Sequence, residues 1–275
     1  MIVPEELKIN EEAALSYTIG WVRDYFKPLK GRKAVIGLSG GSDSTFTAYA
    51  CQKALGGRNV LGVIMPADST PPDDVKDAEE LADLLGIDTV RIDIMPILEK
   101  VESADPEISL EKHRIAKANI KARIRMLLLY KEANKLDGIV AGTDDRSEHD
   151  LGYYTKYGDG GVDINVPEHL YKTELRQILL YIGRKEKMPL FERVAEKTPS
   201  PGLWNGQTAE NELDMRYEDI DRILYRINEK HMDSLDGISR ETGIKPGCIE
   251  KVFRMIDGNG HKGILPPSPP IKYFK

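Results

Sequence analysis

The segment Ser39-Gly40-Gly41-Ser42-Asp43-Ser44 has the residue types of a phosphate-binding loop. Glycines let the backbone turn tightly and bring N–H groups close to a ligand, and a helix that starts at the loop adds partial positive charge. The loop lacks both the Gly-Lys-Ser/Thr ending of a Walker loop and the Gly-x-Gly-x-x-Gly spacing of dinucleotide-binding folds. The alternative is a tight structural turn in which Asp43 and Ser44 cap the helix.

Two further loops carry residues that could do chemistry. In residues 142–150, which are rich in carboxylates, Glu148 could bind a metal through one or two oxygens and Thr143 could cap a short helix. Acid-rich loops are usually solvated surface, so that interpretation stays open. Residues 152–163 combine glycines, tyrosines, one lysine and two aspartates, which predicts a loop shaped around a ligand. An array of surface turns is the alternative.

A long basic helix is expected over about 110–134. At 100° per residue, four basic side chains fall on one side of this helix, which predicts a solvated basic face: Arg114, Lys117, Lys121 and Arg125. Arg123 lies opposite them, among Ala116, Asn119 and Met126, and is therefore expected to point inward. An inward arginine needs an anionic partner, either a protein carboxylate or the phosphate or carboxylate of a ligand.

The elements that must position these loops form an α/β pattern. Strands are expected at 33–38, 59–65, 89–94 and 138–142, with helices at about 5–27, up to 55, 71–85 and 110–134. The first helix carries a recurrent apolar set, Ala13, Ala14, Tyr17, Trp21 and Tyr25. Strands separated by helices predict a parallel sheet with helices on both faces, whose ligands lie at the carboxyl ends of the strands. From about Tyr171 the chain is expected to be mostly helical, with irregular loops at 152–165 and 197–212 and a proline-rich tail at 266–270.

Composition excludes several classes of protein. The 275 residues carry 39 Lys and Arg against 45 Asp and Glu, and the net charge of −6 disfavours a nucleic-acid partner. No run of about 18 apolar residues predicts a membrane span, and the N-terminal residues do not resemble a signal peptide. Cys51 and Cys248 cannot form a disulfide framework, which is typical of a reducing compartment. The expected location is the cytoplasm.

The loop at 39–44 resembles that of the ATP pyrophosphatases, which split ATP into AMP and pyrophosphate while activating an oxygen atom as an adenylate. With its other motifs, the chain resembles the ammonia-dependent NAD synthetases. The matching segments occur in family order along nearly the whole chain: Asn119–Arg123, Gly142-Thr143 with Glu148, Thr155–Asp163, Tyr171–Thr173, Lys197–Trp204, Gly206–Thr208 and His261-Lys262. The segment around Lys156 is the most specific, because other ATP pyrophosphatases do not share it.

The resemblance implies an adenine nucleotide alpha hydrolase-like fold: a doubly wound, mostly parallel sheet with helices on both faces and a helical C-terminal extension. One synthetase domain is expected over 1–275, with its core sheet at about 30–170 and the extension from about 171. The implied reaction is ATP-driven amidation of deamido-NAD to NAD through an acyl-adenylate, with release of AMP and pyrophosphate. The implied substrates are deamido-NAD, ATP and ammonia, and the implied assembly is a homodimer with the deamido-NAD site at the subunit interface.

The resemblance also assigns roles to residues. The implied ATP contacts are Gly37, Leu38, Ser39, Gly40, Gly41, Ser42, Asp43, Ser44, Thr143, Lys172 and Ser200. The implied deamido-NAD contacts are Arg123, Lys156, Asp163, His261 and Lys262. Mg²⁺ would be held by Asp43 and Glu148, and these two residues and Lys172 are the expected catalytic set.

Some features differ from the commonest family pattern, and alternatives remain. Gly263, Pro201 and Gly202 depart from it, which affects the expected contacts of the tail and of the 197–212 loop. Glutamine-using relatives carry a glutaminase domain before the synthetase part, so ammonia is the expected nitrogen source here. The alternatives are another ATP pyrophosphatase that acts on a nucleotide or tRNA, and a nucleotide-binding regulator without turnover. The 197–212 loop and the tail from about Gly258 are the expected lids over substrate.

Overall fold

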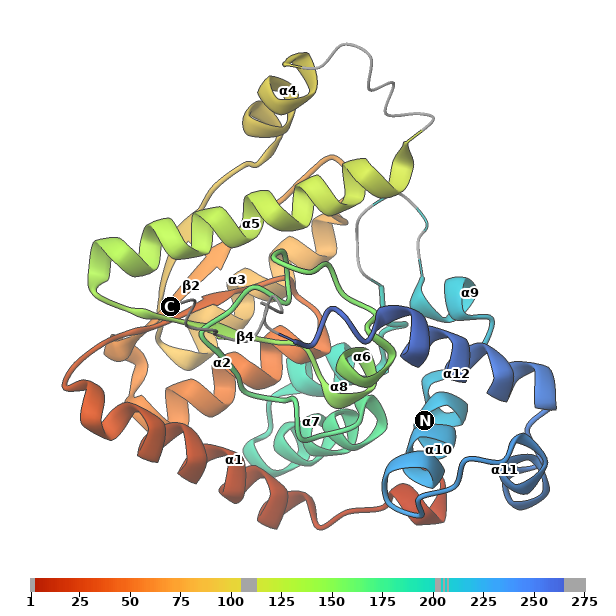
Figure 1. Cartoon of the computed structure of the whole chain (residues 1–275). Helices are drawn as coiled ribbons and strands as arrows, with labels where there is room; N and C mark the ends of the chain where they lie inside the picture. The colour runs from red at the N-terminus through yellow and green to blue at the C-terminus, as the bar shows by residue number, and fades with distance from the viewer. Residues whose placement is uncertain (1–2, 105–112, 201–203, 205, 207, 265–275) are drawn as a thin grey trace, which may run out of the picture.

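A five-stranded parallel sheet forms the centre of the fold, and it lies among helices (Figure 1). The computed structural model describes residues 3–104, 113–200, 204, 206 and 208–264. The strands lie in the order β3-β2-β1-β4-β5. They are β1 Ala34–Gly37, β2 Val60–Ile64, β3 Asp88–Arg91, β4 Ile139–Gly142 and β5 Ile164–Asn165. The prediction of a doubly wound parallel sheet is confirmed, and the order places β1 and β4, with their predicted ligand loops, side by side.

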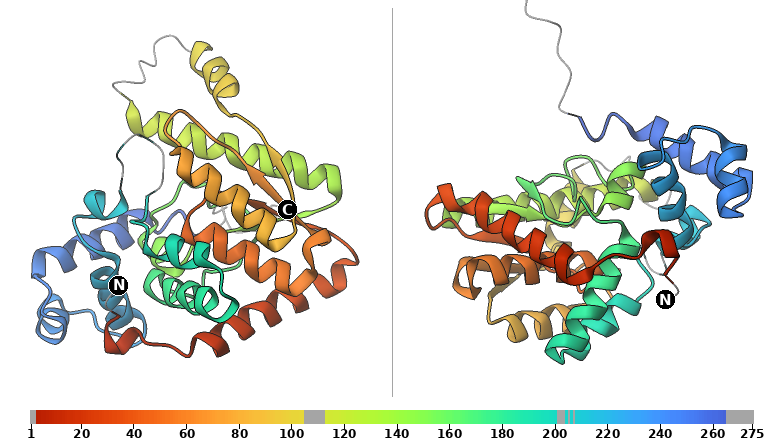
Figure 2. Two further views of the ribbon diagram at one scale, coloured as in Figure 1. Left: turned by 180° about the vertical axis from the view of Figure 1, so that it is seen from behind. Right: turned by 90° about the horizontal axis from the view of Figure 1, so that it is seen from below.

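The two faces of the sheet are buried under different helices, because successive side chains of a strand point to opposite sides. Ala34 and Ile36 of β1 contribute to one apolar core, whereas Val35 contributes to another. The first core is covered by α1 Glu11–Phe26, α2 Ser42–Leu55, α3 Pro72–Leu85, α7 Lys172–Glu186 and α8 Pro189–Glu196. The second is covered by α4 Met95–Ser103 and α5 Arg114–Leu136. Figure 2 shows this layering from two further directions.

A third apolar core holds a group of helices at one end of the molecule (Figure 2). Its helices are α9 Ala209–Leu213, α10 Tyr217–Asn228, α11 Leu235–Thr242 and α12 Pro246–Asn259. Leu151 at the end of α6 Arg146–Leu151 and Tyr171 also belong to this core, which joins it to the loop that follows β4. The short 3₁₀ helices are Glu5–Leu7, Lys27–Leu29 and Gly57–Asn59. No helix in the described part of the chain is long and apolar enough to cross a membrane.

The first helix is confirmed, but it starts later than predicted. Asn10 accepts a hydrogen bond from the Ala13 N–H and so starts α1 at Glu11, later than expected. The buried side of α1 carries Leu15, Thr18, Val22 and Phe26. The recurrent spacing of apolar residues did indicate a helix, but the aromatic members of that set lie on its exposed side: Tyr17, Trp21 and Tyr25 are 65%, 39% and 37% exposed.

The predicted orientation of α5 was also wrong. Arg123 is exposed, whereas Lys121 is only 2% exposed and forms an ion pair of 2.5 Å with Asp68. Arg125 is partly buried, and its Nε donates to the carbonyl oxygen of Met65 at 3.2 Å. The partners of both basic residues belong to the end of β2 and the loop that follows it. The expected solvated basic face therefore packs in part against the carboxyl edge of the sheet, where it finds a carboxylate and a carbonyl oxygen.

Candidate active site

The loop between β1 and α2 is held in shape by its own serines. Ser44 is buried, and its Oγ accepts from the N–H of Ser39 at 3.2 Å and lies 2.9 Å from the Ser39 Oγ. The Ser39 Oγ in turn accepts from the N–H of Gly41 at 3.2 Å. Helix α2 begins at Ser42, and its N-cap residue Gly41 provides no side-chain cap. The alternative in which Asp43 and Ser44 cap the helix is therefore wrong, and the helix N-terminus can receive an anion.

Gly40 is the position at which this loop requires glycine. Its φ is +76°, and an added Cβ would lie 2.1 Å from the carbonyl oxygen of Asp74. The Gly40 carbonyl oxygen accepts from the Nζ of Lys197 at 2.9 Å, and Lys197 also forms an ion pair of 2.7 Å with Asp74. The backbone of the loop is thus pressed against the start of α3 and fixed there by a lysine that follows α8.

Gly40→Ala is expected to destabilise the fold and to disrupt the loop, whereas Gly31→Ala serves as the matched control. Both glycines have positive φ, but nothing lies within 4 Å of a Cβ at Gly31. Gly31→Ala should therefore cost only the backbone strain, about 1 kcal/mol. Gly40→Ala should cost at least about 1 kcal/mol more, because the Cβ collides with backbone. Urea unfolding of both variants measures this difference, and equal losses would contradict the close approach of Asp74.

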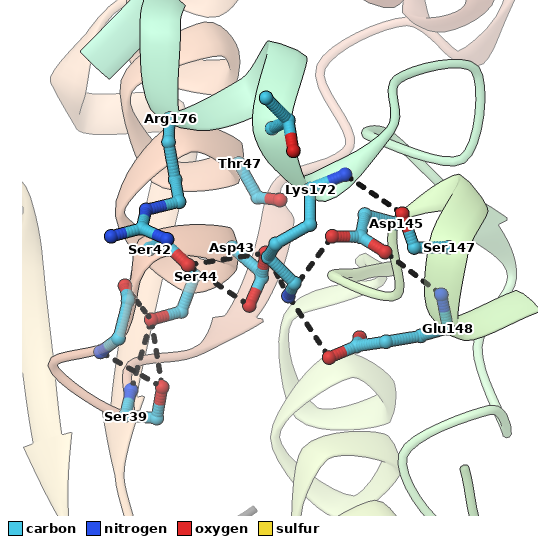
Figure 3. A network of polar contacts seen from close by, with 12 residues as sticks. Ser39, Ser42, Asp43, Ser44, Thr47, Asp145, Ser147, Glu148, Lys172 and Arg176 are labelled. Atoms are coloured by element: carbon cyan, nitrogen blue, oxygen red, sulfur yellow. Dashed lines mark hydrogen bonds and ion pairs between the residues drawn. The ribbon is translucent and has the colours of Figure 1, made fainter. Parts of the chain in front are cut away.

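Lys172 is where the two predicted loops meet (Figure 3). It is the first residue of α7, and its side chain is 1% exposed. Its Nζ lies 2.8 Å from Asp43 Oδ1, 2.9 Å from Asp145 Oδ2 and 2.9 Å from Glu148 Oε1. The structure therefore brings the three predicted catalytic residues Asp43, Glu148 and Lys172 together at one point of the sheet edge.

The electrostatics of this cluster follow from burial and from the number of carboxylates. Burial lowers the pKa of Lys172, but Asp145, Asp43 and Glu148 together outweigh it and raise that pKa well above its usual range. Burial raises the pKa of Asp145 to about 7, against the opposing effect of Lys172. Burial, with Asp145 and Asp43, also raises the pKa of Glu148 well above its usual range despite Lys172. More carboxylates than cations meet here, so a cation that enters the site is stabilised.

Asp43 and Glu148 fit the predicted magnesium site in the chemistry of their donors. Their side chains remain 22% and 20% exposed, whereas that of Asp145 is fully buried. Among the described residues, no group of three or more His, Cys, Asp or Glu side chains is placed to hold a metal by itself. Two partly exposed carboxylates suit Mg²⁺, which usually takes one or two carboxylates together with waters and substrate phosphates.

Three of the predicted substrate residues lie together at a neighbouring cavity. Lys156, Asp163 and Lys262 line a space of about 500 Å³, between α5, the 152–165 loop and the segment after α12. The Lys262 Nζ donates to the carbonyl oxygens of Gly152 and Tyr154 at 2.6 and 2.9 Å. The Lys156 Nζ donates to the carbonyl oxygens of His261 and Ile264. The wall of the cavity thus carries two lysines, which can meet an anionic ligand, together with the carboxylates of Asp144, Asp163 and Glu168.

Asp163 and Arg123 also have contacts with the protein itself. The Asp163 carboxylate accepts from the Val140 N–H at 2.8 Å and from the Tyr130 hydroxyl at 3.1 Å, and so ties the loop to β4 and α5. Arg123 Nη2 donates to the carbonyl oxygen of Lys156 at 3.3 Å. Arg123 therefore reaches the substrate loop from an exposed position on α5, and the prediction that it points inward is corrected.

The remaining predicted residues lie around these two places. Gly37 and Leu38 form the end of β1 and the entry to the phosphate loop, and Thr143 follows β4. Ser200 and His261 are exposed, and both belong to the segments that were expected to be lids. Pro201, Gly202 and the 266–270 tail lie outside the described residues. The predicted cap at Thr143 was wrong, because Asp145 is the N-cap of α6 and accepts from the Glu148 N–H at 2.9 Å.

Sequence reasoning missed Asp145 as part of the site. One of its oxygens caps α6, and the other, Oδ2, faces Lys172 as an ion pair without a directed hydrogen bond. The sequence does hold a signal for it. Asp145 stands three residues before Glu148, which is the spacing of an N-cap and an N3 acid at the start of a helix.

Comparisons with known proteins identify similar sequences. Residues 14–266 match the sequence model of the NAD synthase family. The "NH(3)-dependent NAD(+) synthetase" of Methanocaldococcus jannaschii is 43% identical over 91% of this chain and 94% of its own length. The protein of the same name from Hyperthermus butylicus is 41% identical, over 96% of this chain and 93% of its own length.

Solved structures share the fold. NMN synthetase from Francisella tularensis is 30% identical, with a TM-score of 0.81, and the match covers 96% of this chain and 100% of that chain. The NH3-dependent NAD synthetase of Campylobacter jejuni has a TM-score of 0.75 over 95% of this chain and 100% of its own; at 24% identity it supports the fold alone.

Proposed function

Because this chain belongs to the NAD synthase family, we propose that it converts deamido-NAD to NAD with ATP and ammonia, the last step of NAD biosynthesis. A carboxylate oxygen of the nicotinate group attacks the α-phosphorus of ATP, and the bond to the β-phosphate oxygen breaks, releasing pyrophosphate. Ammonia then attacks the acyl carbon of the adenylate, loses a proton, and displaces AMP. The observation that carries this proposal is the meeting of Asp43, Glu148 and Lys172 beside the loop at 39–44.

In this proposal the phosphate loop and Lys172 hold ATP. The uncapped N–H groups at the start of α2 would receive the phosphates that leave as pyrophosphate. Lys172 would direct its ammonium group towards the same phosphates, and the burial of its side chain keeps that charge at the edge of the site. Thr143 and Ser200 would supply hydroxyl groups from the surrounding loops. Catalysis is then positioning and charge stabilisation, with a nucleophile that the substrate provides.

Magnesium is part of the proposal. Asp43 and Glu148 would hold Mg²⁺ beside the ATP phosphates, and their partly exposed side chains support this role. When bound, the ion would neutralise charge on the leaving pyrophosphate. The excess of carboxylates around Lys172 is the feature that favours a second cation at this point.

The cavity lined by Lys156, Asp163 and Lys262 is the proposed deamido-NAD site, with Arg123 and His261 at its border. Tyr157 and Ile264 line the cavity and remain 52% and 56% exposed. A second copy of the chain that covered these side chains would complete the site, which supports the proposed homodimer. We also propose one synthetase domain over 1–275 and a cytoplasmic location; the latter is supported by the unpaired thiols of Cys51 and Cys248.

A mononucleotide acceptor is the second candidate, because a solved structure 30% identical to this chain is named an NMN synthetase. The relatives at 43% and 41% identity are named NAD synthetases, which favours the dinucleotide. Another ATP pyrophosphatase activity and a regulator without turnover are disfavoured by the same names. The two lysines beside the cavity suit any anionic nucleotide and do not separate these activities.

A substrate comparison tests the proposed function. Purified protein with MgATP and ammonium should convert deamido-NAD with a kcat/KM at least about tenfold above that for nicotinate mononucleotide, because the larger ligand makes more contacts. Glutamine in place of ammonium should give little product. Formation of the amidated mononucleotide as the faster reaction would replace the dinucleotide assignment, and product from neither acceptor would refute the amidation.

A further inference from the structure

The start of α7 is held by residues from two other helices. Its first N–H groups belong to Lys172 and Thr173 and have no partner within their own helix, as at every helix N-terminus. The Lys172 N–H donates to the Oγ of Ser147 at 2.9 Å, and the Thr173 N–H donates to Asp221 Oδ2 at 2.8 Å. Ser147 belongs to α6, and Asp221 belongs to α10 in the helical end of the molecule.

Asp221 connects both of these contacts. Its other oxygen, Oδ1, accepts from the Ser147 hydroxyl at 2.5 Å, so one carboxylate holds Thr173 directly and Lys172 through Ser147. The residue is fully buried, and no Lys, Arg or His of the described residues forms an ion pair with it. Burial raises its pKa to about 6, against the hydrogen bonds from Ser147 and Thr173. A buried carboxylate that is costly to ionise is thus placed where the partial positive charge of a helix N-terminus favours it.

Helix α10 also contacts the other end of Lys172. The Nζ lies over the ring of Tyr217 at 5.3 Å from its centroid, and Tyr217 is fully buried. Two residues one turn apart on α10 therefore hold Lys172 at both ends. Tyr217 contacts its ammonium group, and Asp221 holds its backbone N–H through Ser147. The three carboxylates in front of that ammonium belong to other elements, α2 and the start of α6.

We propose that Asp221 is a positioning residue, which sets the place of the Lys172 ammonium by fixing the first turn of α7 against α6 and α10. The catalytic consequence of this inference rests on the proposed function, whereas the placement of Lys172 by Asp221 does not. The helical end of the molecule would then contribute to adenylate formation without touching substrate. A displacement of about 1 Å in a positioned catalytic group can cost about 100-fold in rate.

Asp221→Asn tests this, with Asp219→Asn as its matched control. Asparagine keeps the size and one acceptor but removes the charge that faces the start of α7. Asp219 is on the same helix, is 29% exposed, and pairs with Arg216 and Arg222 rather than with α7. For Asp221→Asn we expect kcat for NAD formation to fall about 10- to 100-fold per folded molecule, with KM for ATP changed less than kcat. Asp219→Asn should stay within about twofold of wild type.

A second measurement does not depend on activity. An amine-reactive acetylating reagent, followed by mass spectrometry, gives the labelling rate of each lysine. Lys172 and Lys121 have side chains that are 1% and 3% exposed, so both should be protected in the wild-type protein. Asp221→Asn should raise labelling at Lys172 and leave Lys121 protected, whereas general opening of the fold would expose both.

The outcomes separate this inference from the proposed function. Wild-type protein that forms no NAD would refute the proposed function, while the labelling ratio of Lys172 to Lys121 would still decide whether Asp221 places Lys172. Selective labelling together with the loss in kcat supports the inference. An unchanged kcat, or a loss in kcat without selective labelling of Lys172, overturns it.

Discussion

Asp43→Asn is expected to lower the rate of NAD formation by at least about 100-fold, roughly 3 kcal/mol, while the protein stays folded. Asparagine keeps the shape of the side chain but loses the charge that pairs with Lys172 and that is proposed to hold Mg²⁺. The fold should tolerate the change because Asp43 lies in the first turn of α2, partly exposed, and does not cap that helix. Steady-state kinetics and thermal unfolding measure the two effects separately.

Asp73→Asn provides the control for this substitution. Asp73 is also an acid in the first turn of a helix, α3, but its side chain is 83% exposed and pairs with the neighbouring Lys76. A surface pair of this kind contributes little, so activity should remain within about twofold of wild type. A wild-type rate in Asp43→Asn would remove Asp43 from the catalytic set. An equal loss of activity in both variants would show that the loss follows from the change in net charge and not from the position of Asp43.

Lys172→Met is expected to remove nearly all activity and to destabilise the protein. The substitution leaves Asp43, Asp145 and Glu148 facing one another without their shared cation. Removal of one partner from a buried ion pair costs about 3 kcal/mol or more, because the remaining charge is buried without compensation. Activity should fall by about 1000-fold, because the variant loses a contact to ATP and also the cation that holds the three carboxylates in place.

The destabilisation by Lys172→Met should grow as the pH rises. Burial already raises the pKa of Asp145 to about 7 with Lys172 present, and loss of the lysine would raise it further. Below pH about 7 Asp145 is protonated in both folded proteins and lowers the stability of both equally, whereas at higher pH it ionises beside Lys172 in the wild type and has no such partner in the variant. The difference in free energy of unfolding from wild type should therefore be small at pH 5 and larger at pH 8.

Urea unfolding at these two pH values measures the effect. The double variant Lys172→Met with Asp145→Asn removes one of the stranded charges, so it should recover part of the stability and none of the activity. Equal destabilisation at pH 5 and pH 8 would show that Lys172 does not affect the ionisation of the three carboxylates. Recovered activity in the double variant would show that Lys172 has no role in the reaction.

The sheet and its loops could be predicted because the signals are local. A central parallel strand is buried on both faces and appears as a short apolar run, as at 34–37 and 60–64. The turn residues at 39–44 then follow directly in the sequence. Strand β5 has only two residues, Ile164 and Asn165, and is defined by its pairing with β4, which no local pattern reveals.

The orientation of α5 could not be predicted from its charges. The basic side of that helix was expected to face solvent, but Lys121 is buried because Asp68, 53 residues away in the chain, lies opposite it. In the same way, Asp221 reaches α7 from 48 residues away. Such partners are brought together only by the tertiary fold. Motifs therefore identified Lys172, but not Ser147 and Asp221, which hold the start of its helix.

The transfer of one oxygen atom tests the central claim, acyl-adenylate formation, most directly. Deamido-NAD labelled with ¹⁸O in its nicotinate carboxylate is incubated with the protein, MgATP and ammonium, and the products are analysed by mass spectrometry. The proposed route moves one labelled oxygen into AMP for each NAD formed, and the pyrophosphate stays unlabelled. AMP without the label, or ADP as the nucleotide product, would contradict it.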